Sequence, residues 1–293
     1  RETMDTTLAF RMSCKSGICG SCTMRINRRA RLACKLKIED EIAKFGEIRI
    51  EPIGNLKIQK DLVCDMQPFF AEMLKVKPWF DSILETESKM APSEVKKIEK
   101  SAECIWCGAC FSDCPSREFN TKYLGPAAAV LAHRYIFDVR DKRKKERLIQ
   151  VMESNIWMCA HCERSTENCP QNIDPQEIIS ILRSELIKEG ITNHDGARHV
   201  QTITNSVKKH GELSEFWLPI GTFGIFRVIK EMPTAIKLFL KHKLPPIFMK
   251  KIKKHDQITQ LYNDVQRDHD EKIVEEMRTR QKMENIERNI KKS

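Results

Sequence analysis

Short β-type runs alternate with polar and glycine-containing stretches over the first 60 residues. The clearest runs are TMRI at residues 23–26 and EIRIEP at residues 47–52. Gly and Asn, which favour turns, separate runs of this kind. The pattern predicts a small β-rich domain over residues 1–60.

A helical pattern follows. From residue 62 to residue 74, apolar residues recur three and four positions apart, a spacing that puts them on one face of a helix. Asp174, Pro175 and Glu177 form a capping-box arrangement at the start of another helix. We therefore predict a helical domain over residues 61–192. Its further helices are expected at residues 126–138, 142–153 and 174–189.

The last hundred residues are basic. Residues 216–254 mix large apolar side chains with nine Lys and Arg from Arg227 onward and one acid, Glu231. A charged stretch with a loose apolar stripe follows from Asp256 and is typical of an exposed helix. We expect residues 193–293 to be a helical, basic C-terminal extension that docks a partner subunit or a membrane surface.

The whole chain of 293 residues has a formal net charge of +10. Its basic run at residues 140–147 has no interleaved aromatic residues, so we expect a solvated helix face and no nucleic-acid partner. No apolar stretch approaches the ~20 residues that span a bilayer, which predicts a soluble or peripheral protein. Of the twelve cysteines, only Cys64 stands apart, and we expect it to be a buried thiol on the apolar face of its helix. The other eleven form three crowded groups, an arrangement that favours metal binding over disulfides.

The first group has the spacing of a plant-type [2Fe-2S] loop. Four residues and then two separate its first three members, and Gly17 and Gly20 allow the backbone to wrap closely. A structural zinc site is the alternative, although it usually takes its thiolates as two short pairs. The predicted ligands are Cys14, Cys19, Cys22 and Cys34.

The second group is the complete bacterial ferredoxin run, CIWCGACFSDCP. Here Cys104, Cys107 and Cys110 would bind one cubane, and the fourth cysteine would reach over to a second cluster. The third group, CAHCERSTENCP, repeats that spacing with serine at the third position. By the same crossover, Cys169 completes the first cubane, a [4Fe-4S] cluster. The second cluster then has the ligands Cys114, Cys159 and Cys162, with Ser165 at the position left over.

Three thiolates fit a [3Fe-4S] cluster, whereas a second [4Fe-4S] cluster needs a fourth ligand such as Ser165 or water. Because alkoxide is a poorer match than thiolate to cluster iron, [3Fe-4S] is favoured. Both alternatives stay open.

Together the motifs SCKSGICGSC, LACK, KDLVCDMQPFF, CIWCGACFSDCP, YLGPAAAVLAHRY and CPQNIDP resemble the iron-sulfur subunit of succinate dehydrogenase and fumarate reductase. The resemblance covers residues 6–190. It implies an α+β chain: a β-grasp [2Fe-2S] ferredoxin domain, whose first strands would precede Arg1, then an α-helical ferredoxin domain. It also implies partners, namely a flavoprotein subunit with covalent FAD and a quinone-reactive membrane-anchor subunit.

Some positions depart from that family. Its members usually carry a variable residue in place of Cys162 and a cysteine in place of Ser165, and paired tryptophans and a histidine are replaced here by Glu118, Phe119 and Ala160. The run from Trp157 to Pro170 instead resembles heterodisulfide-reductase-type subunits. Unconventional members of this kind pair with a cysteine-rich subunit.

These observations favour an electron-transfer subunit of a succinate:quinone oxidoreductase or fumarate reductase, with no catalytic residue or substrate site of its own. The resemblance places it peripherally on the inner or cytoplasmic membrane, on the cytoplasmic or, alternatively, the periplasmic face. The other hypotheses are a subunit of a thiol-coupled reductase, acting on heterodisulfide or as thiol:fumarate reductase, and a zinc-stabilised interaction module.

Overall fold

The structure is a computed structural model that describes residues 5–80, 90–243, 245–246, 251–253, 255–265 and 267. The chain divides into two compact units, Arg1–Ile191 and Thr192–Ser293. Each unit is described by itself.

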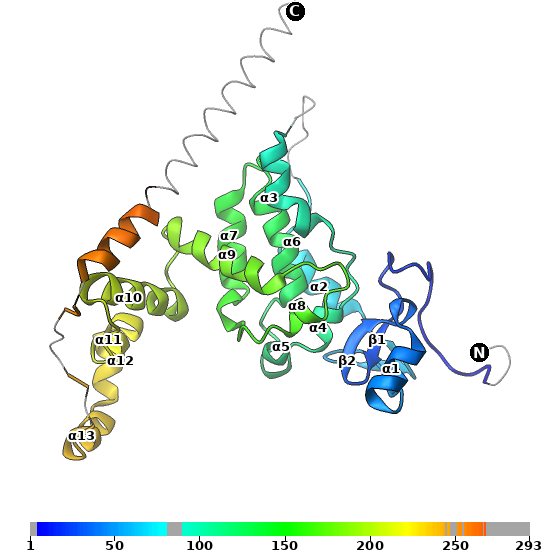
Figure 1. The fold of residues 1–293 in the computed structure, drawn as a ribbon, viewed down its shortest axis with the longest axis horizontal. Helices are drawn as coiled ribbons and strands as arrows, with labels where there is room; N and C mark the ends of the chain where they lie inside the picture. Colours follow the sequence, from blue (N-terminus) through cyan, green and yellow to red (C-terminus); the bar gives the residue numbers. More distant parts are fainter. Residues whose placement is uncertain are drawn as a thin grey trace, which may run out of the picture. The chain divides into compact units, whose positions relative to one another are not determined.

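The N-terminal part of the first unit contains a three-stranded antiparallel sheet in the order β2-β1-β3. The TMRI run forms β1, as predicted, and pairs with β2 from Thr23 opposite Leu32 to Ile26 opposite Arg29. Asn27 and Arg28 connect the two strands with positive φ, as a two-residue hairpin turn with the twist of its strands requires. Helix α1 follows the hairpin (Figure 1). The bounds are β1 Thr23–Ile26, β2 Arg29–Leu32, α1 Ile38–Phe45 and β3 Ile50–Glu51.

The helix predicted from residue 62 onward begins five residues later. Residues before it form a second hairpin, β4 (Ile58–Lys60) with β5 (Val63–Cys64), and α2 spans Gln67–Lys75. Two local features set this start: the Asp65 carboxylate accepts a hydrogen bond from the Gln67 amide at 2.9 Å, and Pro68 lies in the first turn. Cys64 is therefore not on a helix. It is buried in β5, as a thiol 3.5 Å from the carbonyl oxygen of Ile53.

Helix α6 lies at the centre of the helical part, where it packs against α2, α3, α7 and α9 (Figure 1). Its early alanines, Ala127 to Ala129, are almost fully buried and allow neighbouring helices to approach closely. The three later helices predicted from the sequence correspond to α6, α7 and α9, and the Asp174 carboxylate caps α9 by accepting from the Glu177 amide at 3.0 Å. The bounds are α3 Pro92–Ala102, α4 Ala109–Ser112, α5 Pro115–Phe119, α6 Pro126–Ile136, α7 Lys144–Glu153, α8 Arg164–Glu167 and α9 Pro175–Lys188.

The second unit is helical. Its longest named helix, α10, packs against α11, while α12 and α13 continue the chain. Residues 255–265 are also helical, as predicted for the charged stretch, whose remainder lies outside the described residues. Among the helices that the structure describes, none has the length and apolar character needed to cross a membrane. The bounds are α10 Asp195–His210, α11 Trp217–Phe223, α12 Ile225–Lys230 and α13 Met232–Leu240.

Candidate iron-sulfur sites

The first cysteine group lies in a tight loop before β1. Within it the amides of Ser16 and Cys19 approach the Cys14 sulfur at 3.4 and 3.3 Å, and the Cys14 amide approaches the Cys19 sulfur at 3.5 Å. Gly17 and Gly20 have φ values of +73° and +70°, at which a residue with a β-carbon would be strained. The Ser21 hydroxyl, with amides of Cys14 and Ser21, lowers the pKa of Cys19 to about 6. Amides directed at sulfur suit thiolates that hold a cluster.

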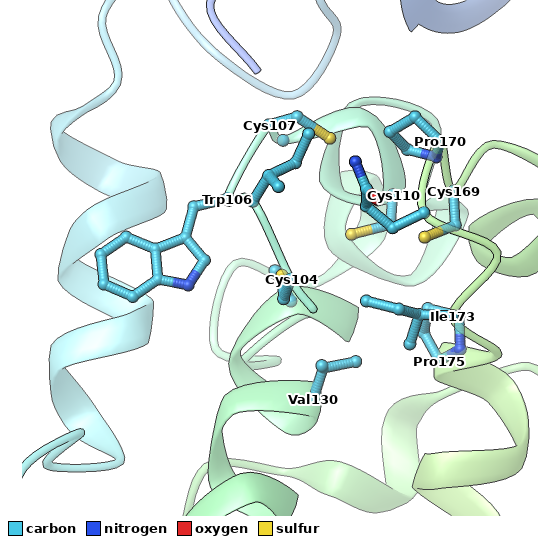
Figure 2. A pocket seen from close by; sticks show the side chains of 13 residues that line it. Cys104, Trp106, Cys107, Cys110, Val130, Cys169, Pro170, Ile173 and Pro175 are labelled. Carbon is cyan, nitrogen blue, oxygen red and sulfur yellow. The ribbon is translucent and has the colours of Figure 1, made fainter. Parts of the chain in front are cut away.

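The second group and Cys169 surround one hollow. Cys104, Cys107, Cys110 and Cys169 line it together with apolar side chains, whereas the Trp106 ring points away from the sulfurs (Figure 2). The hollow is partly open to solvent. These are the four residues expected to bind the [4Fe-4S] cluster.

Burial raises the pKa of three thiols around this hollow, those of Cys104, Cys107 and Cys110. The pKa of Cys104 rises to about 11 by desolvation, and the pKa of Cys110 rises well above its ordinary value for the same reason. The protein alone therefore favours neutral thiols here. Cationic iron supplies the charge that a set of buried thiolates needs, so this donor set fits a cluster.

A second hollow, with about 290 Å³ between atoms, contains the remaining predicted ligands. Burial raises the pKa of Cys114 to about 11, whereas Cys162 is exposed. In the part of the chain that the structure describes, no three His, Cys, Asp or Glu side chains are arranged to hold a single metal ion. The lining includes Cys110, Cys114, Cys159, Cys162 and Ser165.

The backbone around the two hollows repeats. Trp106 and His161, each just before a cysteine, have φ values of +55° and +50°. Gly108 and Glu163, each just after that cysteine, are left-handed N-caps of the short helices α4 and α8. Ser165 therefore occupies in the second run the backbone position that Cys110 occupies in the first. Serine replaces a ligand without removing the frame that presented it.

Asp113 connects the sheet to both cysteine runs. Its buried carboxylate pairs with Arg25 at 3.2 Å and accepts hydrogen bonds from the Ala30 amide and the Asn168 side chain, both at 2.8 Å. It directly precedes Cys114. Sequence reasoning missed this residue, because an aspartate inside a ferredoxin run gives no local sign of a partner 83 residues away.

Comparisons with known proteins identify two iron-sulfur domains in this chain. A model of a 2Fe-2S iron-sulfur cluster binding domain matches residues 1–71, and a model of a 4Fe-4S dicluster domain matches residues 100–173. The fumarate reductase iron-sulfur subunit of Haemophilus influenzae is 32% identical over 205 residues, which cover 64% of this chain and 79% of the relative. The chain belongs to the fumarate reductase iron-sulfur subunit family.

This family membership makes the chain a subunit of an oxidoreductase, with [2Fe-2S] and [4Fe-4S] clusters as cofactors. The α+β expectation, a ferredoxin-type domain followed by a helical one, is confirmed. A chain of the Mycobacterium smegmatis Sdh1 complex has the same fold, with a TM-score of 0.54 and 23% identity, over 64% of this chain and 81% of that one.

Another fumarate reductase relative extends further along this chain. The 8-methylmenaquinol:fumarate reductase iron-sulfur subunit of Wolinella succinogenes is 31% identical over 256 residues, covering 84% of this chain and 80% of the relative. Because 84% of 293 residues is about 246, and the first unit has 191, this match includes part of the basic second unit.

Proposed function

We propose that this subunit carries single electrons through three clusters in a complex that interconverts succinate and fumarate. The [4Fe-4S] cluster lies between the other two, and the chain itself binds no dicarboxylate. The second cluster is [3Fe-4S], or [4Fe-4S] with Ser165 or water as fourth ligand. The ligands are Cys14, Cys19, Cys22 and Cys34 for [2Fe-2S], Cys104, Cys107, Cys110 and Cys169 for [4Fe-4S], and Cys114, Cys159 and Cys162 for the second cluster.

One relationship carries this proposal, namely that the three sites adjoin in series. Gly20, in the first loop, lies against Cys107, and Cys110 lines both hollows. Gln171 and Lys35 add hydrogen bonds across the first junction, to the carbonyls of Gly17 and Pro170 at 3.3 and 3.1 Å. A chain of adjacent clusters is what stepwise electron transfer requires.

The two ends of the series reach the surface. Cys14 and Cys19 are exposed at one end, and Cys162 is exposed at the other. This supports an FAD-containing flavoprotein as the partner at the first cluster and a quinone-linked or cysteine-rich subunit at the second. The exposed Cys162 also supports the thiol-coupled alternative, because a thiol or disulfide could approach the cluster there.

The experiment that tests the relay is anaerobic purification of the complex, identification of its subunits, and assay of succinate oxidation and fumarate reduction with quinones and with thiols. Replacing Cys107 by Ser should abolish electron transfer between substrate and acceptor. The matched control is Cys64→Ala, because Cys64 is a buried thiol outside all three sites. Full activity in Cys107→Ser, or equal loss in Cys64→Ala, contradicts the assignment.

The second unit is the part that binds the membrane, specifically an anionic lipid surface. On α12 and α13 large apolar side chains are exposed, Phe226 by 84% and Phe239 by 65% of their surface. Between residues 225 and 243, five Lys and Arg accompany one acid, Glu231. Exposed apolar residues beside basic ones suit the headgroup region, where each cation contributes about 1 kcal/mol.

Binding to vesicles tests this surface. The complex should bind vesicles that contain phosphatidylglycerol and bind weakly to phosphatidylcholine alone, with affinity falling as salt rises. Replacing Phe226 and Phe239 by Ser should reduce binding several-fold, whereas Ile38→Ser, an exposed apolar change in the first unit, should not. Unchanged vesicle binding in the double variant would contradict the proposal that this surface binds lipid. Loss of a protein subunit from the complex would instead show that the surface binds that subunit.

A further inference from the structure

A tyrosine in the core of the helical part has a buried hydroxyl. Tyr123 is fully buried, and in the part of the chain that the structure describes its hydroxyl oxygen makes no hydrogen bond. The Cys159 thiol is within reach of this side chain, so the O–H group lies at a predicted ligand of the second cluster.

The Tyr123 ring is packed in the hydrophobic core, and its backbone is held on both sides. Arg117 donates a hydrogen bond to the Tyr123 carbonyl, and the Leu124 amide donates to the Ser154 carbonyl at 3.0 Å. Leaving a buried hydroxyl unsatisfied costs about 1–3 kcal/mol. An O–H group fixed in this way indicates an acceptor that belongs at the site.

Arg183 approaches the same cysteine from α9. Its guanidinium donates to the carbonyls of Ile156 and Cys159, at 3.0 and 2.9 Å, and stacks over the Trp157 ring with its central carbon 5.0 Å from the centroid. It also donates to Nε2 of His161. Its Nε is buried without a hydrogen-bond partner among the described residues, and no carboxylate there forms an ion pair with Arg183.

Arg183 is half-buried, and a cation in such a place without a carboxylate partner is stabilised by an anion beside it. A cluster held by thiolates is such an anion, and it also offers acceptor sulfurs to a hydroxyl. The O–H of Tyr123 and the charge of Arg183 thus lie at one place, around Cys159.

We propose that Tyr123 donates a hydrogen bond to the sulfur of Cys159 and that Arg183 supplies a positive charge beside it, so that together they raise the reduction potential of the second cluster. This inference rests on the proposed function, which puts a cluster at Cys159. Both groups favour the reduced cluster, because one added electron makes it more negative. No bond forms or breaks, and Tyr123 keeps its proton. Both are positioning residues that make the second cluster the electron sink of the series.

Tyr123→Phe is the sharpest variant, because it removes one oxygen from a buried ring. Its matched control is Tyr135→Phe, which removes a hydroxyl on α6 that donates to the Pro78 carbonyl at 2.6 Å. In EPR-monitored redox titrations of the intact complex, Tyr123→Phe should lower the midpoint potential of the second cluster. We expect about a tenfold change in the reduction constant, or ~59 mV for one electron. Tyr135→Phe should leave the potential unchanged.

Arg183 provides a second pair of variants that is informative even if Tyr123→Phe does not assemble. Arg183→Gln removes the charge and should lower the potential, whereas Arg183→Lys keeps the charge and should lower it less. An intact second cluster with wild-type potential in Tyr123→Phe, or equal potentials in the two Arg183 variants, overturns the inference. Absence of a second cluster from the wild-type complex instead refutes the proposed function.

Discussion

Gly20 touches Cys107 so closely that a β-carbon on Gly20 would lie 2.8 Å from the β-carbon of Cys107 and 2.9 Å from its Cα. This contact joins the loop of the first site to the run of the second. Its closeness depends on the absence of a side chain, and on a φ of +70° that glycine adopts without strain. In the proposed relay, the junction between the first two sites therefore depends on one residue without a side chain.

Replacing Gly20 by Ala should separate the two sites. The added methyl group must displace backbone, so we expect slower reduction of the [4Fe-4S] cluster by the [2Fe-2S] cluster, measured by freeze-quench EPR, together with lower stability. Gly46→Ala is the matched control, since Gly46 has a φ of +75° but nothing within 4 Å of the added carbon. It should cost only about 1 kcal/mol of backbone strain. Equal effects of the two variants on the transfer rate contradict the role given to Gly20.

Ser165→Cys should convert the second cluster toward [4Fe-4S]. The variant restores a thiolate at the backbone position equivalent to Cys110, and thiolate is the softer ligand for iron. The measurement is EPR of the oxidised protein, in which the signal of an oxidised [3Fe-4S] cluster should disappear. If the native protein already holds [4Fe-4S], Ser165→Ala separates the remaining two ligands: loss of the cubane implicates serine, and retention implicates water.

Arg147 should be among the most sensitive positions for stability. Its side chain is almost fully buried, pairs with the buried Asp141, and donates to the carbonyls of Val76 and Trp79 at 2.9 and 2.7 Å. Arg147→Met leaves the Asp141 charge unpaired and should cost about 3–5 kcal/mol of unfolding free energy in guanidinium titrations. Lys100→Gln breaks an exposed pair with Glu103 and should cost under about 1 kcal/mol. A small effect at Arg147 would show that water reaches this pair.

His133 should make stability fall in mild acid. Burial lowers its pKa to about 4, and because Ser101 donates its hydroxyl to the Ile98 carbonyl, Nδ1 of His133 must donate to Ser101 at 3.2 Å. In the unfolded chain His133 binds a proton near pH 6.5, whereas in the folded chain it binds one only near pH 4. The free energy of unfolding therefore decreases as the pH falls from 6.5 to 4, by up to about 3 kcal/mol. The measurement is denaturant unfolding of wild type and His133→Gln at several pH values. The difference between their free energies of unfolding should decrease as the pH falls from 6.5 to 4. A constant difference contradicts this.

Local patterns predicted those elements that local chemistry determines. TMRI forms a strand, as its β-type residues predict, and Asp174 caps α9. Both signals lie within a few residues of the element that they determine. The predicted start of the helix at residue 62 was wrong. Val63 and Cys64 instead form a strand that pairs with Ile58 and Lys60, although their apolar spacing also fits a helix. Apolar periodicity over so few residues does not distinguish these outcomes.

The candidate site divides in the same way. Cysteine spacing selected eleven ligands, and the structure gathers Cys169 with Cys104 and Cys114 with Cys159 around separate hollows. The surroundings were not predictable, since Arg183 is one of 51 Lys and Arg and Tyr123 one of three tyrosines. Their significance comes from contacts with Cys159 that only the fold creates.

Iron analysis with EPR of the anaerobically purified complex tests the three-cluster relay most directly. Ligand counting predicts about nine or ten iron atoms per chain, as one [2Fe-2S] cluster, one [4Fe-4S] cluster and a third cluster with three or four irons. Three distinct signals should be resolved during stepwise reduction, and the third cluster should be reduced at the highest potential. If the third cluster is [3Fe-4S], its signal is present in the oxidised protein and disappears first, before the signals of the reduced [2Fe-2S] and [4Fe-4S] clusters appear. Stoichiometric zinc with little iron, or only two clusters in undamaged protein, would contradict the account.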